Sequence, residues 1–412
     1  MHVLQLFEQI AHIPHCSGET GELGDFIQSF GQKHGYRVER DPAGNILCYR
    51  SRRELCLQAH YDMVCVGKAP LIELIQKDGW LEAKDSSLGA DNGIGVAIML
   101  ALMEEKSEAE FLFTNDEEIG LVGAKNLQLE LKASRMLNLD SEEFGKIYVG
   151  CAGGVDIVAY APCSKGPSSK PYFYTIKAKN FPGGHSGVDI DKDIPNAIKA
   201  FAHFAKGAKI AWLKAGERRN SIPVHLEGVI GVEGELESNE WFEVMRSDPQ
   251  PVVDKDVWRI VCSFADGVRG WQKEFGIPSR SANLAKIAVD ENLVIECSLR
   301  ANSDEDLDRC ECEYKTFFES FGMDVEVKDC YWAWKPVVTP FAKEVARVYE
   351  RYSKPQFTAI HAGLECAIFA KKYPSMQIAS IGPTIQNPHS VHERVKLADI
   401  EPIYAIAKEL IG

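Results

Sequence analysis

Short apolar runs alternate with helix-like stretches through the first 160 residues of this 412-residue chain, and this alternation restricts the fold more than any other feature. The runs at 54–60, 110–116 and 135–140 have the length and composition of buried strands. Between the first two, the stretch 92–105 is apolar on nearly every face and is long enough for a buried helix. Strands that alternate with helices predict an α/β fold, with a mostly parallel sheet and helices on both of its faces.

The pattern changes at residues 161–170, which are rich in Pro, Ser, Gly and Lys and are typical of a linker. Beyond them, strand-like runs at 172–179 and 293–300 flank a helix-like stretch at 194–212, and together they indicate a separate α+β unit. The α/β pattern then returns with a helix-like stretch at 335–352 and an apolar strand at 376–383.

One domain inserted into another is the simplest organisation that fits these changes. We predict a first domain made of residues 1–167 and 336–412, with an α+β domain inserted at 168–335. The sequence contains no convincing internal repeat and no low-complexity tract.

Composition and charge exclude several classes of function. The net charge of −14 argues against a nucleic-acid partner or an anionic membrane surface. The first residues lack the features of a secretion signal, and no stretch reaches the roughly 18 apolar residues that span a bilayer. The twelve cysteines are scattered, a pattern that predicts reduced thiols in the cytoplasm and not a disulfide framework.

Acids and histidines gather where the predicted strands end, which is where ligands bind in open α/β sheets. The set consists of His60, Asp116, Glu117, Glu118, Asp140 and His389, with Asp91 in the loop before the buried helix. Taken singly, each is more readily explained as a loop residue or a helix cap. Several carboxylates in one crevice are costly unless protons or cations neutralise them, and imidazole with carboxylate suits zinc or a similar divalent ion.

The adjacent acids Glu117 and Glu118 suggest a division of labour. Successive side chains on an extended segment point to opposite sides, so the two carboxylates do not face the same atom. We expect Glu118 to bind a metal ion and Glu117 to act as general base on a neighbouring water. Asp62 lies two residues after His60 and points to the same side, which predicts that it holds the imidazole through its other nitrogen.

Eight separated motifs strengthen this interpretation. They are HYDM, LGADNGIG, TNDEEIG, NLDSEE, GCAGGVD, GGHSG, HAGLEC and GPTIQNPHS. Their order resembles that of the M20 metallopeptidases, and most closely the bacterial aminoacyl-histidine dipeptidases, also called cytosolic non-specific dipeptidases. The resemblance implies a catalytic domain with an inserted lid domain, and hydrolysis of unblocked dipeptides, Xaa-His among them.

By the same resemblance, the catalytic domain carries two divalent ions, most readily Zn²⁺, about 3.5–4 Å apart, with Co²⁺ or Mn²⁺ as other possible ions. His60 and Asp140 bind one ion, Glu118 and His389 bind the other, and Asp91 bridges them. Glu117 is the general base and Asp62 the partner of His60. The final motif departs from the family pattern, because PHSVHE stands where PHSPDE is expected.

The resemblance also implies roles in the lid. His185 holds the scissile carbonyl oxygen in the transition state, and Arg300 receives the substrate carboxylate. His361 and Asn220 are further candidates for substrate contact. A homodimer is possible, and His185 then acts either within its own chain or in the partner's site.

Two other enzymatic activities and one non-enzymatic function remain open. An N-acyl-amino-acid deacylase or a tripeptidase shares the reaction chemistry and differs only in the pocket beyond the metal ions. A binding protein on the same fold needs neither ligands nor base, but all five ligands and Glu117 are present in this sequence.

Overall fold

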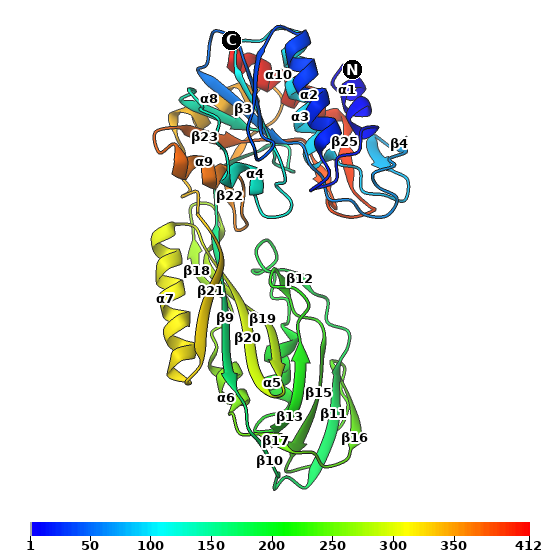
Figure 1. Ribbon diagram of the computed structural model, residues 1–412, viewed down its shortest axis with the longest axis vertical. Helices are drawn as coiled ribbons and strands as arrows, with labels where there is room; N and C mark the ends of the chain where they lie inside the picture. The colour runs from blue at the N-terminus through cyan, green and yellow to red at the C-terminus, as the bar shows by residue number, and fades with distance from the viewer. Residues whose placement is uncertain (1) are drawn as a thin grey trace. The chain divides into compact units, whose positions relative to one another are not determined.

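The computed structural model describes residues 2–412 of the chain. They fold into two compact units, the first coloured blue to cyan and orange to red, the second green to yellow (Figure 1). The first unit comprises the chain up to Gly150 together with Pro336–Ala359 and Leu364–Gly412. The second comprises Cys151–Lys335 and Ile360–Gly363.

An eight-stranded sheet forms the centre of the first unit. In order across the sheet, its strands are β1 (Arg37–Arg40), β2 (Ile46–Tyr49), β6 (Glu110–Thr114), β3 (Leu55–His60), β7 (Arg135–Asn138), β23 (Gln377–Ser380), β8 (Lys146–Cys151) and β22 (Gln356–Ile360). The pairs β6–β3, β3–β7 and β7–β23 are parallel, as the sequence predicted. The pairs β1–β2, β2–β6 and β23–β8 are antiparallel, so the sheet is parallel at its centre and antiparallel toward its edges.

Helices cover both faces of the central strands. Every residue of β3 and β6 is buried, and because successive side chains point to opposite faces, each face must be packed. The predicted buried helix is confirmed as α3, in which nearly all residues are buried. The helices of this unit are α1 (His2–Ala11), α2 (Gly21–Lys33), α3 (Ala90–Glu104), α4 (Val122–Lys125), α8 (Pro340–Tyr349), α9 (Cys366–Lys372) and α10 (Leu397–Ile411).

A small antiparallel sheet joins two distant parts of the first unit. Its strands, in order, are β24 (Ile385–Gln386), β25 (Arg394–Lys396), β5 (Trp80–Ala83) and β4 (Leu74–Lys77). Because β25 pairs with β5, the late segment that carries His389 lies beside the segment that leads into α3.

The second unit is built on a nine-stranded antiparallel sheet. Its strands, in order, are β16 (Phe242–Ser247), β11 (Tyr172–Ala178), β15 (Leu226–Val232), β13 (Lys209–Ala215), β19 (Ile277–Val289), β20 (Asn292–Ala301), β9 (Gly153–Pro162) and β21 (Asp324–Tyr331), with β18 (Gly267–Gln272) also paired to β19. Two short ladders pair β10 (Lys165–Gly166) with β17 (Val252–Val253), and β12 (Gly184–His185) with β14 (Ser221–Ile222). The helices are α5 (Ala197–Phe204), α6 (Val257–Ser263) and α7 (Asp304–Ser320).

The second unit begins earlier than the predicted start at residue 168. Strand β9 pairs along its whole length with β20 and also with β21, so residues 153–162 belong to this sheet. The predicted linker at 161–170 had placed these residues in the first domain. The pairing partners of β9, which are distant in sequence, assign these residues to the second unit.

The predicted helix at 194–212 is wrong beyond residue 204. Helix α5 ends at Phe204, and the chain reverses at Gly207, which has a left-handed φ of +72°. Residues 209–215 then form strand β13, paired with β15 and β19. An apolar run that continues through a glycine was therefore a helix followed by a strand.

The expectation that all cysteines are reduced is also wrong. Cys16 and Cys65 form a disulfide bond with their Cα atoms 5.5 Å apart. The two partners are 49 residues apart, and no spacing motif marks them in the sequence. The bond joins the segment after α1 to the segment after β3.

Candidate metal centre

The structure brings all five predicted metal ligands together at one edge of the central sheet. Their donor atoms form three groups in which all ligand atoms lie within 4.8 Å of one another. The groups are His60 with Asp91 and Asp140, His60 with Glu117 and Glu118, and Asp91 with Glu118 and His389. The group that contains Glu117 also places the predicted general base within this cluster.

Parallel strands explain why these side chains meet. His60 is the last residue of β3, Asp140 follows β7, and Glu117 and Glu118 follow β6. In the sheet, β3 lies between β6 and β7 and is parallel to both, so their carboxyl ends lie at the same edge. The sequence predicted this arrangement from the position of each residue at a strand end.

Asp91 stands between the two histidines. One of its carboxylate oxygens, Oδ1, lies 3.3 Å from His60 Nε2, and the other, Oδ2, lies 3.2 Å from His389 Nε2. The same nitrogen of each histidine also lies near a second acid: Asp140 Oδ1 is 3.3 Å from His60 Nε2, and Glu118 Oε1 is 2.8 Å from His389 Nε2. The two halves of the cluster are therefore alike and share the carboxylate of Asp91.

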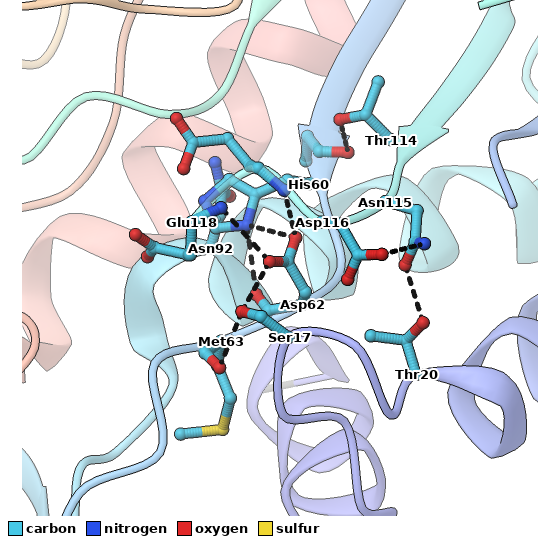
Figure 2. A network of polar contacts seen from close by, with 12 residues as sticks. Ser17, Thr20, His60, Asp62, Met63, Asn92, Thr114, Asn115, Asp116 and Glu118 are labelled. Atoms are coloured by element: carbon cyan, nitrogen blue, oxygen red, sulfur yellow. Dashed lines mark hydrogen bonds and ion pairs between the residues drawn. The ribbon is translucent and has the colours of Figure 1, made fainter. Parts of the chain in front are cut away.

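Asp62 holds both the imidazole and the acidic turn (Figure 2). Its backbone carbonyl oxygen lies 3.0 Å from His60 Nδ1, and its carboxylate Oδ1 lies 3.4 Å from the same nitrogen, so the predicted side-chain contact is the longer of the two. The same carboxylate accepts the backbone N–H groups of Glu117 at 2.9 Å and Glu118 at 3.2 Å. Ser17 donates its hydroxyl to Asp62 Oδ2 at 2.8 Å. Asp62 thus orients one ligand and fixes the backbone of the next two acids.

Burial and mutual repulsion shape the charges of the cluster. Burial raises the pKa of Glu117 well above its ordinary value, and the neighbouring carboxylates of Glu118 and Asp140 raise it further. Burial likewise raises the pKa of Glu118 and of Asp140. Burial opposes the charge of His389, but hydrogen bonds to Asp91 and Glu118 outweigh it and raise the pKa of His389 to about 11. Without a bound cation, protons must neutralise the negative charge of these carboxylates. A divalent cation would supply positive charge in place of those protons.

The donor set fits divalent metal ions. Two imidazoles, which are borderline ligands, together with three carboxylates, which are harder ones, suit zinc and related transition ions. His392, which stands where the family pattern has an acid, is exposed and belongs to none of the metal-binding groups found among residues 2–412. The altered PHSVHE motif therefore leaves His389 in place as the candidate ligand.

Glu393, in the same motif, is a positioning residue that the sequence analysis missed. Its carboxylate is buried and accepts four successive backbone N–H groups at the start of α3, from Leu88 at 2.7 Å, Gly89 at 2.9 Å, Ala90 at 2.8 Å and Asp91 at 3.2 Å. The residue that carries this carboxylate is four positions after His389. Glu393 therefore links the backbone of the candidate ligand Asp91 to the segment that carries the candidate ligand His389.

We expect Glu393→Gln to lower metal affinity about 10- to 100-fold, because the amide keeps the volume but its NH₂ group cannot accept from the backbone. The measurement is competition with a metal chelator, followed by the metal content of the protein. Glu401→Gln, on an exposed face of α10, serves as the matched control and should bind metal like the wild type. Unaltered affinity in Glu393→Gln would show that the backbone of Asp91 holds its position without this carboxylate.

Two further acids beside the cluster, the half-buried Glu142 and the buried Glu365, were also missed. Burial raises the pKa of Glu142 and of Glu365 to about 8 in each case. Glu365 accepts hydrogen bonds from Gln58 Nε2 and Thr114 Oγ1, both at 2.6 Å. Their presence in the NLDSEE and HAGLEC motifs was the available signal. NLDSEE does not indicate which of its acids lies beside the cluster, and HAGLEC does not indicate that its one acid is buried.

The four predicted lid residues lie in the second unit, where they gather around Gly187. A Cβ atom on Gly187 would lie 2.5 Å from His361 O, 3.1 Å from His185 Cε1 and 3.2 Å from Arg300 Cζ. The N–H of Ser186 donates to Asn220 O at 2.9 Å. A glycine at position 187 therefore allows His361 and Arg300 to approach the segment of His185.

The two histidines of this group have different hydrogen bonding. His185 Nδ1 accepts the backbone N–H groups of Gly187 at 3.1 Å and Val188 at 3.2 Å, which leaves the proton of the neutral ring on Nε2. Burial and the nearby charge of Arg300 lower the pKa of His361 to about 3. His361 is thus neutral, and its Nε2 lies 2.8 Å from Ser281 Oγ.

None of the described residues, 2–412, forms a helix that is long and apolar enough to cross a membrane.

Comparisons with known proteins relate the chain as a whole to a peptidase family. The model of peptidase family M20/M25/M40 matches residues 56–412. The cytosol non-specific dipeptidase of Escherichia coli (strain K12) is 31% identical over 98% of this chain and 96% of its own length. The crystal structure of aminoacylhistidine dipeptidase from Vibrio alginolyticus superposes with a TM-score of 0.85 at 28% identity, covering 99% of this chain and 96% of that one.

A more distant structure shares the fold alone. A tripeptidase from Staphylococcus aureus matches with a TM-score of 0.60 at 18% identity, over 100% of this chain and 97% of its own. The family match and the dipeptidase relative each extend over most of the chain. The protein therefore belongs to peptidase family M20/M25/M40 and is a metal-dependent peptide hydrolase.

Proposed function

We propose that this protein is a dipeptidase that hydrolyses unblocked dipeptides with two divalent metal ions, Zn²⁺ foremost. The shared carboxylate of Asp91, with one oxygen toward His60 and the other toward His389, is the observation that carries the proposal. One ion would lie with His60 and Asp140, and the other with Glu118 and His389. When bound, the ions supply Lewis-acid chemistry, which makes water more acidic and polarises the scissile carbonyl.

Glu117 is the general base in this proposal. Its carboxylate takes a proton from the attacking water and returns it to the nitrogen of the leaving amino acid. The support is geometric: Glu117 lies in the cluster with His60 and Glu118, and its backbone N–H is held by Asp62 at 2.9 Å. Burial, which raises the pKa of Glu117, also makes it a stronger proton acceptor than an exposed glutamate.

His185 and Arg300 would bind the substrate in this proposal. A proton on His185 Nε2 gives the imidazole a donor for the oxyanion of the transition state. Arg300 is 6% exposed, and no carboxylate among residues 2–412 forms an ion pair with it. A buried guanidinium without an acidic partner favours an anionic ligand, here the substrate carboxylate. His361 and Asn220 would contribute secondary contacts.

A preference for Xaa-His, a homodimer and a cytoplasmic location complete the proposal. The name of the Escherichia coli relative supports the location, and that of the Vibrio alginolyticus relative supports the preference. In a homodimer, His185 would act either in its own site or in that of the partner. A deacylase or tripeptidase would use the same cluster, so the activity on different substrates has to distinguish these two enzymes from a dipeptidase.

The test is hydrolysis of Ala-His, Gly-Gly and an N-acetyl amino acid by protein that has been stripped of metal and then titrated with Zn²⁺, Co²⁺ or Mn²⁺. We expect activity to return near two equivalents of ion and only on the free dipeptides, because the cluster has two similar halves. Activity on the acetylated compound would assign the protein to the deacylases. Two bound ions without turnover would support a binding protein.

A further inference from the structure

Arg300 has one hydrogen-bonding neighbour that the proposed function does not use. Its Nη1 donates to the hydroxyl oxygen of Tyr331 at 2.7 Å. Its Nε is buried and has no hydrogen-bond partner among residues 2–412. The guanidinium is thus anchored at one nitrogen and keeps further donors for a ligand.

Two glycines hold the ring of Tyr331. A Cβ atom on Gly154 would lie 2.5 Å from Cζ and 2.5 Å from the hydroxyl oxygen of Tyr331. A Cβ atom on Gly363 would lie 2.9 Å from Cε2 of the same ring. These glycines come from the motifs GCAGGVD and HAGLEC, which lie far apart in the sequence. A larger residue at either position would displace the ring, so packing fixes the direction of its hydroxyl group.

The hydroxyl group of Tyr331 is also a donor. Its oxygen accepts from Arg300, and no described residue accepts its proton. A hydroxyl that accepts from a cation is polarised and becomes a better donor. An anion bound by the guanidinium of Arg300 would therefore find this second donor beside it.

We propose that Tyr331 determines specificity for a free C-terminal carboxylate, by positioning the guanidinium of Arg300 and by donating its hydroxyl proton to the same carboxylate. This inference rests on the proposed function, since it takes the ligand of Arg300 to be the substrate carboxylate. It adds a neutral donor to the site and gives a reason for the two glycines that frame the ring.

The test is Tyr331→Phe, which keeps the ring and removes the hydroxyl group. Hydrogen bonds to charged groups contribute enough that we expect KM for free dipeptides to rise about 10-fold, with kcat nearly unchanged. Dipeptides with an amidated C-terminus should show the same kcat/KM in both proteins. Tyr314→Phe is the control, because Tyr314 is buried in the same unit and also accepts from an arginine, Arg269 Nη1 at 2.8 Å, but already donates its own proton to Ala265 O.

A binding measurement separates this inference from the proposed function. A dipeptide analogue with a reduced CH₂–NH bond, with either a free or an amidated C-terminus, is titrated calorimetrically into the metal-loaded full-length protein. Preference for the free acid that falls about 10-fold in Tyr331→Phe supports the inference, even if the wild type cleaves no dipeptide and the peptidase proposal fails. Equal binding of acid and amide by the wild type, or a preference unchanged in Tyr331→Phe, would overturn it.

A second variant tests the positioning without altering the tyrosine. Gly363→Ala brings a methyl group against the ring, so it should also lower the preference for the free acid. If Tyr331→Phe fails to fold, Gly363→Ala tests whether Tyr331 positions the guanidinium of Arg300. An unchanged preference in folded Gly363→Ala would then contradict the positioning role.

Discussion

Replacement of Glu117 by glutamine is expected to lower kcat for unblocked dipeptides by about 10²-fold or more, while two divalent ions remain bound. The amide has nearly the same volume and can still occupy the site beside His60 and Glu118. It cannot accept a proton from water, however, and so it cannot return one to the leaving nitrogen. The measurement combines steady-state kinetics with the metal content of the purified protein.

Glu118→Gln is the matched control for this experiment. It changes the neighbouring residue in the same turn, whose Oε1 lies 2.8 Å from His389 Nε2, and should lose metal together with activity. If Glu117→Gln loses metal while Glu118→Gln keeps it, the two glutamates have been assigned in the wrong order. Retention of near wild-type turnover by Glu117→Gln would rule it out as the base.

Arg300→Ala is expected to lower kcat/KM for free dipeptides by about 10²-fold, because it removes a buried charge that would pair with the substrate carboxylate. Substrates with an amidated C-terminus carry no such charge, so they should lose much less. The measurement is the ratio of kcat/KM for acid and amide in both proteins. Arg246→Ala provides a control in the same unit, since Arg246 Nη1 donates to Tyr174 Oη but is more exposed.

An equal loss on acid and amide substrates would sink the assignment of Arg300 as the carboxylate receiver. It would indicate that the guanidinium supports the packing around Gly187, where its Cζ lies 3.2 Å from the position of a Cβ atom. Arg300→Lys gives a further check. A lysine keeps the charge but cannot donate to Tyr331 and the carboxylate in a fixed fork, so it should restore little of the preference.

The central strands could be predicted because their signal is local. The runs that became β3 and β6 are buried on both faces, and such runs remain apolar without alternation. The helix expected at 194–212 failed because one apolar run supplied both α5 and β13, and the break at Gly207 is a conformational choice that depends on the sheet. In such a run, pairing with strands that are distant in sequence decides which residues form a helix and which form a strand.

The convergence of the candidate ligands could be predicted because strand ends and motifs mark them, whereas the residues that position these candidates could not be predicted. Glu393 acts on N–H groups about 300 positions earlier in the chain, a relation that exists only in the folded protein. Tyr331 lies outside every motif and is recognised by its contacts with Gly154 and Gly363. The disulfide between Cys16 and Cys65 was missed for the same reason.

The hydrogen bonds that Glu393 accepts determine when, during translation, the candidate metal centre can be completed. His60, Asp91, Glu118 and Asp140 leave the ribosome early, but His389 and the carboxylate that holds the start of α3 are translated only after the whole second unit. A growing chain therefore holds an incomplete set of the candidate ligands until both units have been made. If these residues hold the metal ions as proposed, an unfinished chain would lack a complete centre, and peptide hydrolysis would begin only after the polypeptide is finished.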